Sequence, residues 1–142
     1  MKLEVILSEW EIDSTIDPDE LVTESLKISK LHFKYISLYT KEHLIQRNME
    51  QQLTILRSDK ADFFTKGETK ETRDKGWEFP GKILKMDVGN YLDKDSDIVK
   101  MNIQLFIQKE KCELLESILR NIQGRSFNIK NAIDWEKFRS GG

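Results

Sequence analysis

Residues 98–122, IVKMNIQLFIQKEKCELLESILRNI, decide the fold class of this chain. Their apolar residues recur every three or four positions, the spacing that places side chains on one face of an α-helix. A flanking apolar face widens the arc, so we expect the helix to pack against more than one partner. The main stripe consists of Ile98, Met101, Leu105, Gln108, Cys112, Leu115, Leu119 and Ile122, and the flanking face of Ile103, Phe106, Ile107, Leu114 and Ile118.

Helix boundary signals flank this stretch on both sides. Asp93, Asp95 and Asp97 offer N-caps, and Gly124 predicts the C-terminal end. The alternating aspartates also resemble the start of a calcium-binding loop. Ile98 stands where an EF-hand requires glycine, so helix capping explains these acids better.

A second long helix is expected from about Pro18 to about Phe64. Apolar residues recur there at heptad spacing, most regularly from Ile28 to Leu38. Proline is favoured at the first position of a helix, as Pro18 would be. Residues 3–11 predict a short amphipathic helix before it.

The remaining segments are a connector and a tail. Residues 66–90 are dense in charge and glycine, which predicts turns, and 82–88 are compatible with a short strand or a helical turn. The tail after Gly124 carries bulky apolar side chains that so short a segment cannot bury alone. We expect them to dock on the body of the protein or on another subunit: Phe127, Ile129, Ile133, Trp135 and Phe138.

An all-α fold of long coiled-coil-like helices with a short amphipathic C-terminal tail follows from these patterns. We expect residues 1–90 to form an N-terminal helical region with the connector, and residues 91–142 a C-terminal helical region. No apolar run exceeds three residues, so no membrane-spanning helix is expected. The acidic N-terminus has no pattern of a secretory signal.

Catalytic and metal-binding functions are not expected. The single cysteine, Cys112, excludes an internal disulfide, and His32 and His43 are three helical turns apart, too far to share an ion. No phosphate-binding loop, nucleophile elbow or zinc-protease motif occurs. The chain is therefore predicted not to be an enzyme, with no metal and no cofactor.

Charge is unevenly distributed along the chain. The net charge is −2 overall, but residues 1–25 carry −7, residues 26–76 carry +4 and residues 77–142 carry +1. A basic middle segment can concentrate nucleic acid, although charge alone favours a solvated helix face as the explanation. Cations lie beside aromatic rings in residues 56–67, LRSDKADFFTKG, the combination that binds single-stranded nucleic acid.

The nucleic-acid-binding residues are predicted in and just after this segment. Phe63 continues the heptad stripe and is expected in the core, whereas Phe64 is expected to be the freer ring. The predicted contacts to nucleic acid are Arg57, Lys60, Phe64, Lys66 and Lys70.

The segment also resembles the basic DNA-binding motif, LKARLDYYSG, of the UvsY family of recombination mediators in T-even-type bacteriophages. Aligned on Asp62, Lys60 takes the place of the arginine, and Phe63 and Phe64 that of the tyrosine pair. Ser58 replaces the first lysine, and Arg57 stands one position earlier. Residues 82–100 and 124–138 are similar to the family as well, so the likeness spans nearly the whole chain.

The resemblance implies a non-enzymatic protein that forms ring-like homo-oligomers, hexamers or heptamers, through its C-terminal part. Such a protein binds single-stranded DNA and a phage recombinase. It helps the recombinase replace the phage single-strand-binding protein during recombination, replication and repair. The implied location is the cytoplasm of the infected bacterial host. Two alternatives stay open: a coiled-coil scaffold that binds only protein, and an enzyme subunit without its own active site.

Overall fold

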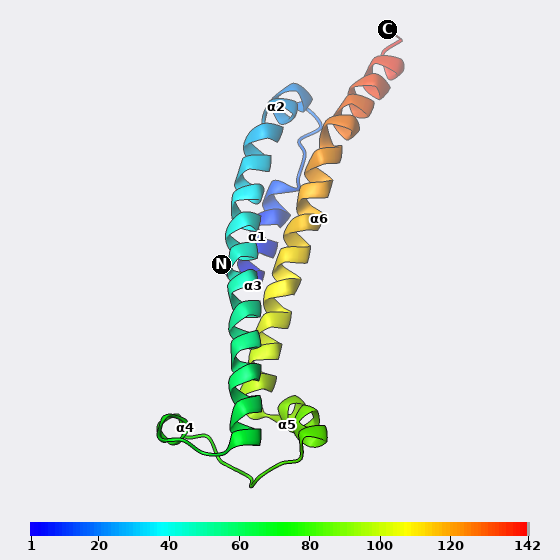
Figure 1. The fold of residues 1–142 in the computed structure, drawn as a ribbon. Coiled ribbons are helices and arrows are strands. Elements are labelled where there is room, and N and C mark those ends of the chain that lie inside the picture. Colours follow the sequence, from blue (N-terminus) through cyan, green and yellow to red (C-terminus); the bar gives the residue numbers. More distant parts are fainter. Residues whose placement is uncertain (142) are drawn as a thin grey trace. The chain divides into compact units, whose positions relative to one another are not determined.

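The computed structural model describes residues 1–141, which form helices and connecting turns with no strand among them (Figure 1). The predicted all-α class is confirmed. Contacts divide the chain into two compact units: unit 1 joins Met1–Leu44 to the chain from Lys109 onward, and unit 2 is Ile45–Gln108. The elements are α1 (Leu3–Asp13), α2 (Leu21–Leu26), α3 (Ile28–Lys66), α4 (Lys70–Asp74), η1 (Lys85–Asp87), α5 (Val88–Lys94) and α6 (Ser96–Arg139).

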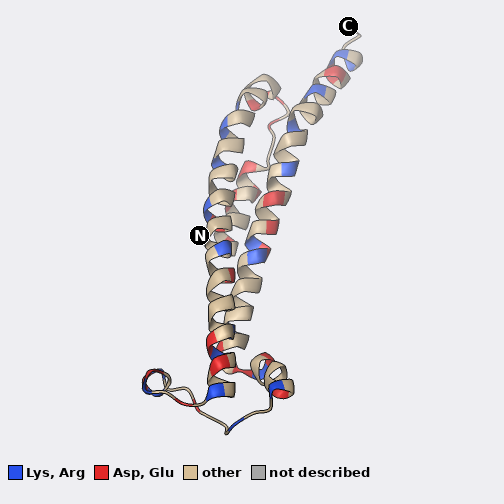
Figure 2. Ribbon diagram, in the orientation of Figure 1, with Lys and Arg blue, Asp and Glu red and all other residues tan. Residues whose placement is uncertain are grey.

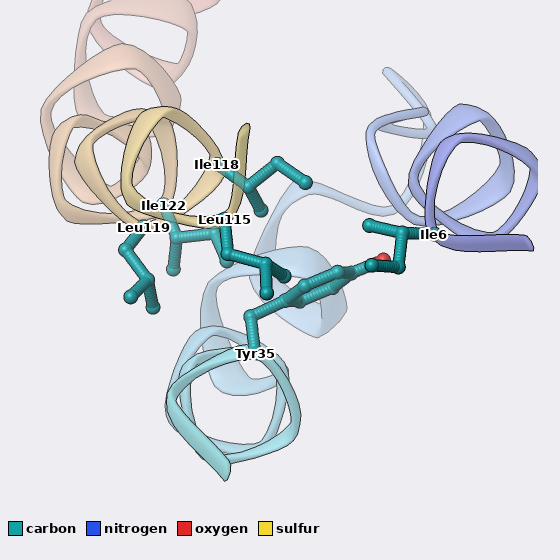
Figure 3. Packing of buried hydrophobic residues seen from close by; sticks show 6 residues of the cluster. All are labelled: Ile6, Tyr35, Leu115, Ile118, Leu119 and Ile122. Atoms are coloured by element: carbon teal, nitrogen blue, oxygen red, sulfur yellow. The ribbon is translucent and has the colours of Figure 1, made fainter. Parts of the chain in front are cut away.

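Unit 1 has a core built by three helices. Ile6 of α1 and Tyr35 of α3 are fully buried against the heptad stripe of α6, as the periodicity of 98–122 predicts. Figure 3 shows these side chains pointing toward one another from the three helices. The α6 residues in this cluster are Leu115, Ile118, Leu119 and Ile122.

A polar network borders this core. The Asp13 carboxylate accepts hydrogen bonds from Lys34 Nζ at 2.6 Å and from Tyr35 Oη at 2.8 Å. Burial acts to raise the pKa of the Asp13 carboxyl. The two hydrogen bonds and the positive charges of Lys34 and Arg125 outweigh burial, so this pKa lies below its ordinary value. Asp13 is therefore held ionised and ties the end of α1 to α3.

The expected helix from Pro18 to Phe64 is divided in the structure. Pro18 lies in a turn, in which the backbone N–H of Asp19 donates to the Asp17 side chain at 2.9 Å. This local bond competes with helix formation, so the chain becomes helical only at α2. Lys27 then separates α2 from α3, and α3 continues to Lys66 as one helix.

Gly124 does not end the last helix, contrary to the sequence prediction. α6 continues through it to Arg139, and Gly124 is not among the glycines with positive φ. A glycine inside a helix costs only about 1 kcal/mol. After Gly124, the side chains of Arg125 and Ile129 are almost fully buried, and their contacts depend on the helix continuing.

Unit 2 has its own core at the end of α3. Phe63 and Phe64 pack with Val88 and Leu92 of α5 and with Ile98 of α6. The segment expected as a connector contributes part of this core and contains α4 and η1. Within residues 82–88, only the last four are helical, in η1 and at the start of α5, and none is in a strand. The predicted N-cap is confirmed, because Asp95 Oδ1 accepts from the backbone N–H of Asp97 at 3.0 Å and of Ile98 at 3.1 Å.

Three glycines give this segment its turns. Gly67 at the end of α3 has φ +98°, Gly76 after α4 has φ +74° and Gly81 has φ +100°, a backbone conformation that side chains disfavour. None of the helices described here has an apolar stretch long enough to cross a membrane. The division into an N-terminal region, 1–90, and a C-terminal region, 91–142, stays a prediction. Each compact unit draws on residues from both sides of position 90.

Candidate nucleic-acid interface

Lys60, the central cation of the predicted DNA-binding motif, is buried. Its Nζ lies 3.1 Å from Asp95 Oδ2 and 2.9 Å from Asp97 Oδ2, and its side chain is only 5 % exposed. The same Nζ lies 4.1 Å from the centre of the Trp77 ring, a cation–π distance. The ammonium group of Lys60 is thus paired with two carboxylates and with the face of an aromatic ring.

Phe64 is also buried, contrary to the expectation that it would be the freer ring. Its exposed fraction is 5 %, and it contacts Phe63 and Tyr91 with ring centres 5.6 and 5.9 Å apart. The expectation for Phe63 is confirmed, because that ring is buried between Trp77 and Phe79. Heptad spacing identified Phe63 as core. It could not identify the connector residues that cover Phe64.

The other predicted contacts are more accessible. Arg57 is half-buried and pairs with Asp93 at 3.3 Å, and Lys66 is exposed and pairs with Asp62 at 3.5 Å. Lys70 is exposed at the first position of α4. Surface pairs of this kind are worth about 0–1 kcal/mol, so a phosphate can displace the carboxylate from each cation.

A cleft of about 610 Å³ in unit 2 lies beside the buried Lys60. We call it the Trp77–Tyr91 cleft. Tyr91 is 44 % exposed. It therefore has the accessibility that the sequence analysis predicted for Phe64. Two exposed lysines border it, and Lys75 also lies 5.0 Å from the Trp77 ring centre. The cleft is lined by Lys60, Phe64, Lys75, Gly76, Trp77, Glu78, Tyr91, Lys94, Asp95, Ser96 and Asp97.

Charge in unit 2 is balanced, with equal numbers of basic and acidic residues between positions 45 and 108. Figure 2 shows the two signs mixed along the stretch from α4 to α5. Because Lys60 is neutralised by its two carboxylates, the outward cations of the cleft are Lys75 and Lys94, opposed by Glu78. One protomer therefore offers a weak electrostatic surface, and binding must also use the aromatic rings.

Trp77, Tyr91, Lys75 and Lys94 were not predicted as site residues from the sequence. Rings and lysines do alternate in residues 66–94, which is the signal that could have found them. Their convergence depends on the long-range contacts of Lys60 with Asp95 and Asp97, and no local pattern encodes such contacts.

The five apolar residues predicted for oligomerisation fall into two groups. Ile129 is 2 % exposed and Ile133 is half-buried within the protomer. Phe127, Trp135 and Phe138 are 66, 59 and 74 % exposed. Trp135 stacks on Phe138 with ring centres 5.6 Å apart. The three exposed rings form a surface that another chain can cover, whereas Ile129 belongs to the protomer's own packing.

Within residues 1–141, no group of three or more histidine, cysteine or carboxylate side chains is arranged to hold a metal ion. The alternating aspartates at 93–97 serve instead as the cap of α6 and as partners of Arg57 and Lys60.

Comparison with known proteins gives a family and a fold. The family profile described as "Recombination, repair and ssDNA binding protein UvsY" matches residues 9–142. Crystal structures of the bacteriophage T4 recombination mediator protein UvsY are similar to the chain. One has a TM-score of 0.84 at 23 % identity, covering 99 % of this chain and 98 % of that one. Another has a TM-score of 0.82 at 20 % identity, covering 98 % and 99 %. No curated protein sequence matches.

Proposed function

Because the chain belongs to the UvsY family of recombination, repair and single-stranded DNA-binding proteins, we propose that it is a recombination mediator. It binds single-stranded DNA through the Trp77–Tyr91 cleft and the exposed cations beside it, and loads a phage recombinase in place of the single-strand-binding protein. The match of the family profile over residues 9–142 carries this proposal.

The cleft suits single-stranded DNA for two physical reasons. Bases stack on aromatic rings whatever their sequence, and each stacked base contributes about 1–3 kcal/mol. Lysines placed beside the rings bind the phosphates that flank a stacked base. Tyr91 supplies the accessible ring, Lys75 and Lys94 border the cleft, and Lys66 and Lys70 are further exposed cations of unit 2.

Assembly compensates for the weak charge of one protomer. The exposed rings of Phe127, Trp135 and Phe138 hold copies of the chain together in a ring-like homo-oligomer. When several clefts bind one DNA strand, each bound cleft raises the effective concentration of DNA at the next. A protein with net charge −2 can then bind DNA tightly enough to compete with the single-strand-binding protein.

The partners in this proposal are single-stranded DNA, the phage recombinase, the phage single-strand-binding protein and further copies of the chain. The site of action is the cytoplasm of the infected bacterium. The chain does not catalyse a reaction and holds no cofactor; it changes the affinity of the recombinase for DNA. By linkage, if the chain raises the affinity of the recombinase for DNA by some factor, the recombinase raises the affinity of the chain for that DNA by the same factor.

The test uses ATP hydrolysis by the cognate recombinase on single-stranded DNA coated with the single-strand-binding protein. Adding the chain should shorten the lag before hydrolysis, and the chain alone should hydrolyse no ATP. A Tyr91→Leu variant should stimulate less than the wild type. If an active recombinase shows the same lag with and without the chain, the mediator proposal is wrong.

A scaffold that binds only protein is the second candidate, and the exposed tail rings would suit it equally. The two candidates differ in what they require of the cleft. A scaffold that binds only protein does not require Lys75 and Lys94 beside the exposed ring of Tyr91. Fluorescence anisotropy with a labelled oligonucleotide separates them, because the scaffold would leave the anisotropy unchanged at low salt.

A further inference from the structure

We infer that Lys60 is a positioning residue, which holds the Trp77–Tyr91 cleft in its binding shape and does not itself contact phosphate. This inference rests on the proposed DNA-binding function and assigns a different role to the central cation of the basic motif.

The surroundings of Lys60 leave its ammonium group no room for a phosphate. Asp95 and Asp97 lie at 3.1 and 2.9 Å from Nζ, and the Trp77 ring centre lies at 4.1 Å. The Asp95 side chain is 11 % exposed. A DNA phosphate that displaced Asp95 would leave a shielded carboxylate buried without its cation. A phosphate that displaced the more exposed Asp97 would still have to give up its water to reach an ammonium group on a side chain that is only 5 % exposed. Such an exchange is unfavourable, because an unpaired charge loses its solvation and gains no partner.

The three partners of Lys60 are the parts from which the cleft is built. Trp77 is one of its rings, and Asp95 is the N-cap of α6. Lys60 itself lies on α3, far from all three in the sequence. One ammonium group thus fixes the connector and the start of α6 against α3. If Lys60 lost these partners, Trp77 would lose the nearer of the two lysine contacts on its ring and would keep its packing on Phe63.

The direction in which DNA affinity changes when the charge of Asp97 is removed distinguishes this role from a phosphate contact. If Asp97 merely masked Lys60, removing its negative charge would strengthen DNA binding, as would removing any acid near the cleft. If Lys60 positions the cleft, the same change weakens binding, because the ammonium group loses one of its two anchors. Asp97 suits the test because its side chain is 52 % exposed, so its replacement disturbs the core little.

Glu78 provides a matched control. It lines the same cleft, is exposed, and is not an ion-pair partner of Lys60. Glu78→Gln and Asp97→Asn each remove one negative charge and keep the size of the side chain. Electrostatics alone therefore predicts that the two variants shift in the same direction.

The experiment measures anisotropy of a labelled oligothymidine against protein concentration at several salt concentrations, with circular dichroism to verify folding. Glu78→Gln should bind roughly twofold more tightly, as expected for a lost repulsion across water and salt. Asp97→Asn should bind about threefold or more weakly, because a cleft whose ring is oriented for only part of the time binds in proportion to that fraction. Tighter binding by Asp97→Asn, matching Glu78→Gln, would overturn the positioning role.

The salt dependence gives a second readout. A lost phosphate contact lowers the slope of log affinity against log salt by about 0.7. Lys60→Gln, which removes the ammonium group that holds Asp95, Asp97 and Trp77, should weaken binding with an unchanged slope. Lys94→Gln should lower the slope. A lower slope in a Lys60→Gln variant that remains folded would contradict the inference.

The results also separate the inference from the proposed function. If the wild type does not bind the oligonucleotide, the proposed function fails and the inference fails with it. If the wild type binds and Lys94→Gln lowers the slope while Asp97→Asn binds more tightly, only the positioning role is wrong.

Discussion

Replacing Tyr91 by leucine tests the placement of the DNA site, because the structure exposes Tyr91 and buries Phe64, the ring that the sequence predicted as a DNA contact. Tyr91 is 44 % exposed, whereas Phe64 is 5 % exposed and packs beneath it with a ring-centre distance of 5.9 Å. Leucine keeps an apolar side chain but removes the aromatic face. Comparing the DNA affinities of the variants Tyr91→Leu and Phe64→Leu therefore shows on which ring a base stacks.

The magnitude follows from the geometry. Phe64 contacts the Tyr91 ring, which leaves that ring able to stack on one base. One stacked base contributes about 1–3 kcal/mol, and the lower end of that range suits a partly exposed ring. A loss of about 1.4 kcal/mol is a tenfold weaker affinity. We expect Tyr91→Leu to bind a labelled oligothymidine about tenfold more weakly per protomer.

Phe64→Leu should behave differently. The side chain lies in the core of unit 2, so its change lowers the free energy of unfolding by about 1 kcal/mol and alters DNA affinity less than threefold. Phe33→Ala controls for the loss of an exposed ring elsewhere, because Phe33 is 70 % exposed in unit 1. Anisotropy titrations and denaturant unfolding give both quantities. If Phe64→Leu weakens binding more than Tyr91→Leu, our placement of the site is wrong.

Three further predictions concern assembly and stability. Trp135→Asp combined with Phe138→Asp should give a smaller assembly by light scattering, and Leu26→Asp, at an equally exposed position, should leave the mass unchanged; equal masses would exclude the tail as an interface. Leu115→Ala should lower the free energy of unfolding by about 2–5 kcal/mol in denaturant titrations, because its fully buried side chain fills the core of unit 1. The lowered pKa of Asp13 contributes stability above its ordinary value near 4, and this is lost as pH falls through the lower folded-state pKa. Asp13→Asn should therefore reduce the loss of stability as pH falls below the ordinary pKa of an aspartate, and an unchanged loss of stability in acid would contradict that role.

The sequence predicts the helices of this protein better than their ends. The apolar stripe of 98–122 predicts the buried face of α6, and Asp95 is the N-cap that the pattern indicates. Gly124 illustrates the limit of local signals: the burial of Ile129 outweighs the modest helix penalty of one glycine. Around Pro18, the hydrogen bond from the backbone N–H of Asp19 to the Asp17 side chain holds a turn, so the helix starts later than the sequence predicts.

The candidate site was less predictable, for a physical reason. A basic motif shows that Lys60 carries a charge, but the partner of that charge depends on tertiary contacts with Asp95 and Asp97, more than thirty residues away. The same holds for Phe64, which the connector and α5 cover. Residues in a dense charge pattern cannot be assigned as DNA contacts until their ion pairs are known.

Photo-crosslinking tests the central claim most directly, namely that this chain binds single-stranded DNA through the Trp77–Tyr91 cleft. The protein would be irradiated with an oligonucleotide of bromodeoxyuridine, digested, and the crosslinked peptides identified by mass spectrometry. Crosslinks at Tyr91 and Trp77, competed away by unlabelled single-stranded DNA, are the result we predict. Competable crosslinks confined to other peptides, with residues 75–97 unmodified, would contradict the account.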